Sequence, residues 1–415
     1  MTIDRPRRAP WETPLVLKSV LFAATLLAAA PSVAKEPPLP AGLRIDRVVL
    51  MMRHGVRPPT KSPPMPAGTA SATWPTWSVK PGYLTEHGRA AVALLGTGDR
   101  TRWMATGLLP RTSCGAIRVI ADSDERTIET ARAYAAALAP GCSVSITHRP
   151  QDEPDPLFTP LEAPGVVFDP AAARAAVLTA AGGERGFAAE EARLRPLLAR
   201  LDAILCAPVT PGCGVTRKPT ALAPAGAGKR PKLTGTLDRA STAAQILLLE
   251  YADGKPMAEV GWGRATPADI GRLAEFHAVE FRLLARPRYV ARANLSLLTP
   301  VITDALTAES GPAVTMISGH DTNIASLGGL LDVHWQVPGV AADDPLPGGA
   351  IVIERLVDAQ GQRFVRTLYR AQTLDQIRTL EPGEPYVAVL PMPGCMARGT
   401  AGLCTEAAFL KRLTR

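Results

Sequence analysis

A short apolar run that ends in a cluster of cations constrains the fold of this chain more than any other feature. Residues 48–52 (VVLMM) are apolar without interruption, and residues 53–59 read RHGVRPP. An unbroken apolar run is typical of a strand covered on both faces, as in the parallel sheet of an α/β protein. Cations at the end of such a strand are costly unless an anion meets them. The run therefore predicts a buried strand with an anion site at its carboxyl end.

Strands and helices alternate at both ends of the chain around a helical middle. The pattern predicts strands at residues 47–52, 117–122, 313–317 and 350–356, and helices at residues 85–95 and 125–138. The order strand, turn, helix is typical of a parallel sheet with crossovers. Between residues 161 and 290 the apolar residues recur with helical spacing, as in Leu194, Leu197, Leu198 and Leu201. We therefore expect an α/β fold with a mostly parallel sheet, flanking helices and a smaller inserted α-helical domain.

The N-terminus has the parts of a secretory signal peptide. Basic residues precede an apolar run at residues 20–30, and Ser32-Val33-Ala34 follows as a small-x-Ala cleavage site. The run is too short to span a bilayer comfortably, although an uncleaved anchor is the alternative. We expect export, with cleavage near Ala34. The expected organisation is a signal peptide at 1–34, a first α/β part at 35–160, a helical insertion at 161–290 and a second α/β part at 291–415.

Six cysteines follow the predicted cleavage site, and an even number in an exported chain favours disulfides. Sequence alone permits fifteen pairings, with six buried free thiols as the alternative. Because short loops close with the least loss of entropy, we favour pairing neighbours, namely Cys114 with Cys142, Cys206 with Cys213, and Cys395 with Cys404. None of the spacings is C-x-x-C, so neither a zinc ribbon nor a thioredoxin site is predicted.

The first cluster of polar residues suits a phosphate group. Arg53 and Arg57 can fork around one phosphate with paired N–H donors. Repulsion from these guanidinium groups favours the neutral form of His54, and a neutral imidazole is nucleophilic even in mild acid. His54 is therefore a candidate to attack phosphorus and carry a phosphoryl group. Gly55 lets the backbone turn sharply and approach a ligand.

Two further clusters follow predicted strands and fit the same chemistry. Residues 318–323 read SGHDTN and residues 122–127 read DSDERT. His320 can donate a hydrogen bond to a phosphate oxygen, and Asp321 can protonate a leaving alkoxide if its pKa is raised. Arg126 would be another phosphate ligand at a helix N-terminus, where the helix dipole also favours an anion.

The charge balance of the chain favours anionic partners. The formal net charge is +8, without a long basic block. Aromatic residues make up only 5% and no stacking motif occurs, which argues against nucleic acid. The run Lys229-Arg230-Pro231-Lys232 is either solvated or part of the rim of a cleft for a polyanion. Four histidines lack ligand-like spacing and are predicted to be surface or packing residues: His87, His148, His277 and His334.

These motifs resemble those of a known family. Residues 53–59 are similar to the RHGxRxP signature of the histidine acid phosphatases, and His320-Asp321 resembles their later HD pair. Residues 124–127 (DERT) resemble their intervening arginine segment. Further segments resemble, in the same order, the bacterial periplasmic phytase/acid phosphatase group: 74–77 (WPTW), 155–158 (DPLF), 261–264 (GWGR) and 319–323 (GHDTN). The resemblance covers about residues 44–410 and implies a periplasmic enzyme with an α/β domain, a helical insertion and no metal or organic cofactor.

The resemblance also implies a role for each site residue. His54 would be the phosphoryl acceptor and Asp321 the general acid. The phosphate clamp would consist of Arg53, Arg57, Arg126 and His320, and the substrate pocket would include Thr60, Lys61 and Asp122. The three cysteine pairs match disulfides of the family. Gln245 is a departure, because close relatives have an acidic residue at this pocket position.

The sequence therefore predicts a phosphomonoesterase that works through a phosphohistidine and is most active in acid. Lys61 and the basic balance favour phytate as the substrate. A broad-specificity or sugar-phosphate (glucose 1-phosphate) phosphatase is the alternative, and a non-catalytic inositol-phosphate binding protein is the alternative from another class. We expect no nucleic acid partner, no stable membrane span and a monomer.

Overall fold

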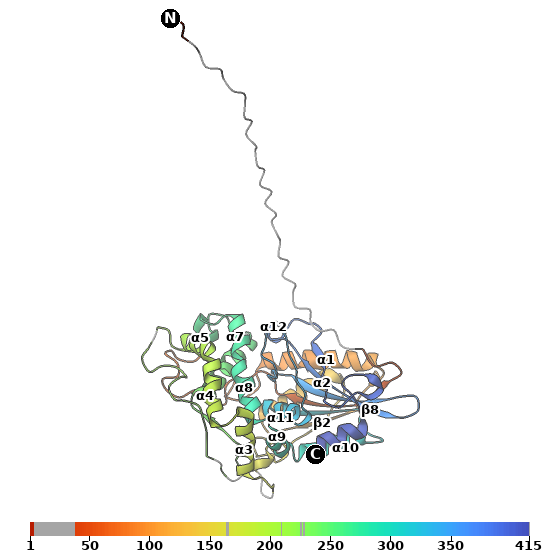
Figure 1. Ribbon diagram of the computed structural model, residues 1–415. Helices are drawn as coiled ribbons and strands as arrows, with labels where there is room; N and C mark the ends of the chain where they lie inside the picture. Colours follow the sequence, from red (N-terminus) through yellow and green to blue (C-terminus); the bar gives the residue numbers. More distant parts are fainter. Residues whose placement is uncertain (4–37, 163–165, 209, 225, 227–228, 415) are drawn as a thin grey trace. The chain divides into compact units, whose positions relative to one another are not determined.

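The computed structural model describes residues 1–3, 38–162, 166–208, 210–224, 226 and 229–414 (Figure 1). From residue 38 onward these residues belong to one compact unit, Val33–Arg415. Apart from its first three residues, the predicted signal peptide lies outside the described residues. In the part of the chain that is described, each helix is too short or too polar to cross a bilayer.

Among the described residues, eight strands form one mixed sheet in this unit. They are β1 (Arg44–Arg53), β2 (Ile117–Ala121), β3 (Ile146–Thr147), β6 (Val314–Gly319), β7 (Ala350–Val357), β8 (Arg363–Ala371), β9 (Tyr386–Val389) and β10 (Leu403–Thr405). The order is β10-β8-β7-β1-β6-β2-β3, and β9 also pairs with β8. The strands β1, β6, β2 and β3 are parallel, whereas β7 to β10 form antiparallel pairs. The parallel half therefore begins at the strand that carries the first motif.

The predicted α/β class with a helical insertion is confirmed, but the sheet is mixed rather than mostly parallel. The difference begins at β7, a predicted strand that pairs antiparallel with β1, and continues in β8, which pairs antiparallel with β7 and which the sequence pattern did not reveal. Its Arg366 and Arg370 resemble surface residues in the sequence, yet they are only 3% and 1% exposed. Each is buried with a carboxylate, Arg366 with Glu354 at 2.7 Å and Arg370 with Asp99 at 2.8 Å. Because each of these buried positions holds an arginine paired with a carboxylate, the hydrophobic pattern of the sequence does not predict a strand here.

Successive side chains of β1 point to opposite faces of the sheet and join two separate cores. The even-numbered residues of 48–52 pack with α1 (Glu86–Ala105) and α2 (Glu125–Leu138). The odd-numbered residues pack in a second core with α6 (Thr236–Ala252) and α11 (Asp321–Leu331). Both faces of the strand are covered, as its unbroken apolar run predicts.

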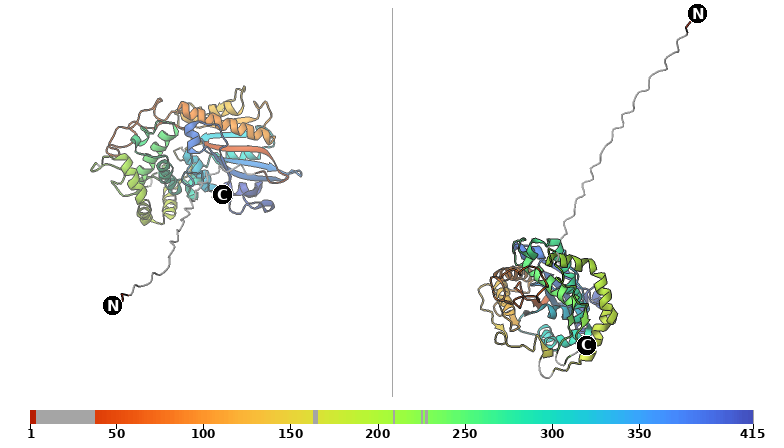
Figure 2. Two further views of the ribbon diagram at one scale, coloured as in Figure 1. Left: turned by 90° about the horizontal axis from the view of Figure 1, so that it is seen from above. Right: turned by 90° about the vertical axis from the view of Figure 1, so that its left-hand side faces the viewer.

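Short helices make up the middle of the chain and lie beside the sheet in Figures 1 and 2. They are α3 (Pro170–Ala181), α4 (Glu184–Arg193), α5 (Arg195–Leu205), α7 (Pro267–Leu273), α8 (Glu275–Leu284) and α9 (Arg288–Asn294), together with α6. Leu197, Leu198 and Leu201, which have helical spacing in the sequence, lie in α5, and Leu194 is the residue where α4 and α5 meet. Pro196 explains the break, because proline fits the first turn of a helix and not its interior. The boundaries 161 and 290 of the inserted domain stay a prediction.

The last third of the chain completes the layers around the sheet. Its helices are α10 (Leu298–Thr307), α12 (Leu374–Thr379) and α13 (Glu406–Thr414), in addition to α11. Disulfides join Cys114 to Cys142, Cys206 to Cys213 and Cys395 to Cys404, which are the neighbouring pairs favoured from the sequence.

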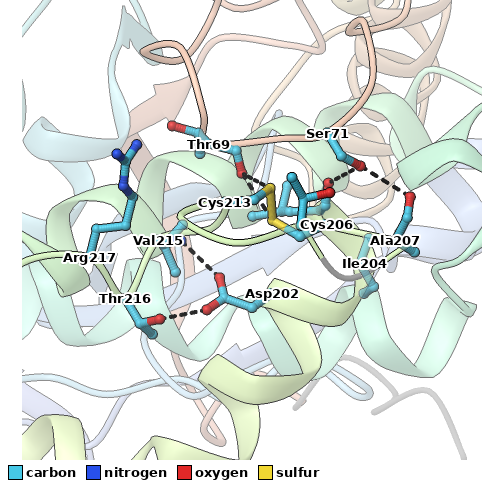
Figure 3. Close-up of a disulfide and its surroundings, with 12 residues drawn as sticks. Thr69, Ser71, Asp202, Ile204, Cys206, Ala207, Cys213, Val215, Thr216 and Arg217 are labelled. Carbon is cyan, nitrogen blue, oxygen red and sulfur yellow. Dashed lines mark hydrogen bonds between the residues drawn. A yellow bond between two sulfur atoms is a disulfide. The ribbon is translucent and has the colours of Figure 1, made fainter.

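The Cys206–Cys213 disulfide lies where α5 leads into a small two-stranded sheet, β4 (Ala221–Leu222) and β5 (Leu233–Thr234). Figure 3 shows Asp202 of α5 beside it, where the carboxylate accepts hydrogen bonds from the N–H of Val215 at 2.8 Å and the hydroxyl of Thr216 at 2.7 Å. The N–H of Ser71 donates to the carbonyl of Leu205 at 2.9 Å. These bonds tie the long loop after β1 to the helical middle of the chain.

Candidate active site

The carboxyl ends of β1, β2 and β6 lie at one edge of the sheet, and each strand leads into one of the motif segments. The N–H of His54 donates to the carbonyl of Gly319 at 2.9 Å, and the N–H of Asp122 donates to the carbonyl of Ser318 at 3.0 Å. Ligands of open α/β sheets bind at this kind of edge. The edge brings together residues 53–57, 122–126 and 318–321.

His54 is buried directly after β1, and one of its ring nitrogens is held in a hydrogen bond. Its Nδ1 lies 2.8 Å from the carbonyl oxygen of Gly55 and donates to it, because that oxygen can only accept. The lone pair therefore resides on Nε2. Glycine at position 55 is required by packing, since a Cβ atom there would lie 2.9 Å from Cδ1 of Leu84 and 3.1 Å from the carbonyl oxygen of Gly88.

Three arginines surround His54 and set its charge. Burial lowers the pKa of His54 well below its ordinary value, and Arg126, Arg57 and Arg53 lower it further. The imidazole is therefore neutral even in acid, as the sequence predicts. Burial, Arg126 and Arg53 also lower the pKa of Arg57 to about 9, so this guanidinium stays charged in acid.

Arg126 and His320 are held by two aspartates. Arg126 pairs with Asp124 at 2.6 Å, and Nε2 of His320 lies 2.5 Å from Oδ2 of Asp122 and 3.4 Å from Oδ2 of Asp124. Asp122, expected in the substrate pocket, is 4% exposed and contacts His320 instead of lining the cavity described below. Ligand atoms of Asp122, Asp124 and His320 lie within 4.8 Å of one another, close enough for a metal ion. Both carboxylates, however, already pair with cationic or hydrogen-bonding side chains.

Asp321 begins α11 and pairs with Arg53, with 3.0 Å between its Oδ2 and NH2 of the guanidinium. Burial raises the pKa of Asp321, but the charge of Arg53, followed by that of His277, outweighs burial and holds the pKa below its usual range. The raised pKa that the sequence analysis gave as the condition for a general acid is therefore not found for Asp321 in this structure. The reason is the guanidinium in direct contact, which stabilises the carboxylate form.

A cavity of about 860 Å³ opens over this edge of the sheet. Five of the predicted residues line it: Arg53, Arg57, Thr60, Lys61 and Asp321. Sequence reasoning missed most of the remaining charged lining, which comes from the helical middle of the chain: Lys218, Lys232, Asp238, Arg239, His277 and Glu280. Of these residues, only Lys232 was indicated by the sequence, because it belongs to the basic run at 229–232 that was considered as the rim of a cleft. The lining carries more lysines and arginines than carboxylates, which favours a strongly anionic ligand.

Two further polar residues shape the bottom of the cavity. Gln245 of α6 accepts a hydrogen bond from Arg53 at 3.1 Å through its Oε1. His277 of α8, predicted as a surface or packing residue, is 5% exposed and lies with its Nε2 at 3.8 Å from Oδ2 of Asp321. The sequence offered one sign that His277 lies in the cavity: it is three residues from Glu280, and residues three apart share a helix face.

Comparison with known families decides what this arrangement is. A profile of the histidine phosphatase superfamily (branch 2) matches residues 44–214 and 287–370, which include the motif segments at the sheet edge. The chain belongs to this superfamily. As a branch 2 histidine phosphatase related to the acid phosphatases and phytases, it is a phosphoric monoester hydrolase.

Individual relatives place this histidine phosphatase among bacterial enzymes. It is 35% identical to phytase AppA of Escherichia coli (strain K12) over 88% of this chain and 90% of the relative. It is 29% identical to the glucose-1-phosphatase of Providencia rettgeri over 88% of each chain. The Hafnia alvei phytase in complex with tartrate superimposes with a TM-score of 0.83 at 34% identity, over 91% of this chain and 98% of that one. The same phytase in complex with myo-inositol hexakis sulphate gives a TM-score of 0.82 at 33% identity.

Proposed function

We propose that this histidine phosphatase hydrolyses phytate and related inositol phosphates through a phosphohistidine. The observation that carries the proposal is the cationic cavity: its lining contains Arg53 and Arg57 of the predicted clamp and, in addition, Lys61, Lys218, Lys232 and Arg239. One phosphate monoester needs only the clamp, whereas a substrate with several phosphates gains from each added cation. The Hafnia alvei structure with a hexasulphate of myo-inositol supports the same substrate class.

In the proposed mechanism the substrate phosphate enters between Arg53, Arg57 and Arg126. Nε2 of His54 attacks phosphorus, because Nδ1 is committed to Gly55 and the ring is neutral. The arginines stabilise the charge of the equatorial oxygens in the transition state. His320, oriented by Asp122, would complete the clamp.

Asp321 acts as the general acid in this proposal. The phosphate dianion offsets the guanidinium charge that keeps Asp321 ionised, so substrate binding raises the pKa of this carboxyl. Protonated Asp321 gives its proton to the leaving alcohol, and the carboxylate then activates the water that hydrolyses the phosphohistidine.

A second candidate is a phosphatase for single sugar phosphates such as glucose 1-phosphate. Gln245 favours it, because the neutral amide contacts Arg53 at a position where an acidic residue is expected in phytases of the group. The likeness to the glucose-1-phosphatase of Providencia rettgeri supports the same alternative.

Export to the periplasm and a monomeric state complete the proposal. The three disulfides support an oxidising compartment. Mass determination of the protein recovered from a periplasmic extract tests both cleavage near Ala34 and oligomeric state.

The decisive experiment combines a substrate panel with one substitution. Phosphate release from phytate, glucose 1-phosphate and p-nitrophenyl phosphate is compared at acidic pH, and a higher kcat/KM for phytate supports the proposal. His54→Ala should abolish turnover and acid-quenched phosphoenzyme while leaving the unfolding temperature near that of the parent protein. Appreciable turnover by His54→Ala would refute the phosphohistidine.

A further inference from the structure

A buried histidine and a buried carboxylate stand directly behind the general acid. Nδ1 of His277 lies 2.5 Å from Oδ1 of Asp344, and Nε2 of the same ring faces Oδ2 of Asp321 at 3.8 Å. Asp344 is 1% exposed, and within the described residues its Oδ2 has no hydrogen-bond partner. A carboxylate buried in this way needs a cation or a proton beside it. His277 is the group placed to supply it.

The surroundings of this pair explain why the ring can hold a mobile proton. Since Nδ1 donates to Asp344, a second proton on Nε2 points at Asp321. The ionisable groups around His277, Asp344 and Asp321 are mixed in kind: Arg53 of β1 and His54 directly after it, His320 before α11, Asp238 from α6, Glu280 from α8 itself, and Tyr369 of β8, which interacts with Asp344. The positive charge of His277 is one of the causes that lower the pKa of Asp321. The two groups are therefore electrostatically linked.

We propose that His277, oriented by Asp344, is a positioning residue that stores the proton which Asp321 delivers to the leaving group. The inference rests on the proposed function, because it assumes that Asp321 is the general acid. Proton storage on His277 explains how Asp321 can act as the general acid although its carboxyl is ionised before substrate binds. His277 and Asp321 together retain one proton, which lies on Nε2 before substrate binds and on Oδ2 when the leaving group departs.

The proton balance closes over one catalytic cycle. When the bond from His54 Nε2 to phosphorus forms and the bond to the ester oxygen breaks, that oxygen takes the proton from Asp321. Asp321 has taken it from Nε2 of His277, whose ring becomes neutral. In the second step water attacks phosphorus and the nitrogen–phosphorus bond breaks. The proton released from water returns through Asp321 to His277.

The test replaces His277 by a residue that can form hydrogen bonds but does not titrate. In His277→Gln, kcat for phytate should fall roughly 100-fold, the lower end of the range for a general acid. For p-nitrophenyl phosphate it should fall less than about threefold, because p-nitrophenolate departs without a proton. KM for both substrates should change little, since the residue acts through Asp321. Asp344→Asn, which keeps the hydrogen-bond acceptor and removes the charge, should show the same selectivity.

The pH profile separates proton storage from a purely electrostatic role. Loss of a stored proton should move the alkaline limb of kcat for phytate to lower pH in His277→Gln. Loss of a positive charge alone would raise the pKa of Asp321 and move the limb to higher pH. The matched control is His334→Gln, because His334 also pairs with a carboxylate, Asp343 at 2.5 Å, but is 65% exposed. It should leave both activities unchanged.

The outcomes distinguish this inference from the proposed function. Equal losses for phytate and p-nitrophenyl phosphate, a change in KM alone, or an alkaline limb at higher pH would overturn proton storage by His277. A parent protein without activity on any phosphomonoester, or without phosphoenzyme, would overturn the proposed function itself.

Discussion

Two of the exposed lysines that line the cavity, Lys218 and Lys232, offer the sharpest test of substrate class. Lys218 precedes β4 and Lys232 directly precedes β5, and both line the cavity. Their backbone is held by hydrogen bonds: the carbonyl of Lys218 accepts from the hydroxyl of Thr236 at 2.7 Å, and the carbonyl of Lys232 accepts from the N–H of Ala223 at 2.8 Å. Replacing both by alanine therefore removes charge without removing the support of the hairpin.

The magnitude follows from Coulomb's law in water. One pair of unit charges at about 4 Å is worth about 1 kcal/mol, and exposed pairs are measured at about 0.2–1 kcal/mol. Losing two contacts with outer phosphates should cost about 1–2 kcal/mol of transition-state stabilisation. This energy corresponds to a fall of about 5- to 30-fold in kcat/KM for phytate. The effect should shrink above 0.1 M salt, where the screening length is about 10 Å.

The assay compares the Lys218→Ala/Lys232→Ala double variant with its parent on two substrates at low and high salt. On p-nitrophenyl phosphate kcat/KM should stay within about twofold, because one phosphate in the clamp does not reach the rim. The matched control is Lys229→Ala/Arg230→Ala, which removes two charges from the same basic run at a separate small cavity. An equal loss on both substrates, or an equal loss in the control, would refute the assignment of the rim to outer phosphates.

Two further predictions concern stability. Glu250 is 1% exposed, and burial raises its pKa to about 7, above the value of 4.5 for a free carboxyl. As the pH rises from about 4.5 to 7, the carboxyl ionises in the unfolded chain before it does in the folded one. The fold should therefore lose about 3 kcal/mol of stability over this range. Glu250→Gln keeps an acceptor for the N–H of Gly261 and should flatten this loss in urea unfolding at pH 4.5 and 7.5; an unchanged slope contradicts the assignment. Breaking Cys114–Cys142, with 28 residues of separation, should cost about 3.6 kcal/mol, against about 2.4 kcal/mol for Cys206–Cys213 with 7. Urea unfolding of the two double alanine variants should reproduce this order, and the reverse order would argue against the loop-entropy estimate.

Local signals were enough to predict the sheet edge. The helix at 125–138 was predicted with the bounds that α2 has, because its acidic start and alanine-rich body agree with each other. The strand β1 was clear because both of its faces are apolar. Each motif directly follows a predicted strand, at residues 47–52, 117–122 or 313–317, and the carboxyl ends of parallel strands meet at one edge of a sheet.

Long-range partners explain what the sequence could not show. The depressed pKa of Asp321 depends on Arg53, which is remote in sequence and is brought to 3.0 Å only by the pairing of β1 with β6. His277 looked like an ordinary packing histidine because Asp344, its partner, lies 67 positions further along the chain. The rim lysines approach the clamp only through the fold of the helical middle.

The place of β1 in the sheet has a consequence for when the site at the sheet edge can assemble. β1 emerges early in synthesis, yet both of its neighbours, β6 and β7, end at Gly319 and Val357. His54 and Asp321 therefore cannot meet until most of the polypeptide has been made, and such distant pairing is slow to form. A chain that ends before β6 has His54 but lacks both strands that flank β1, so the pocket at the sheet edge cannot assemble in it.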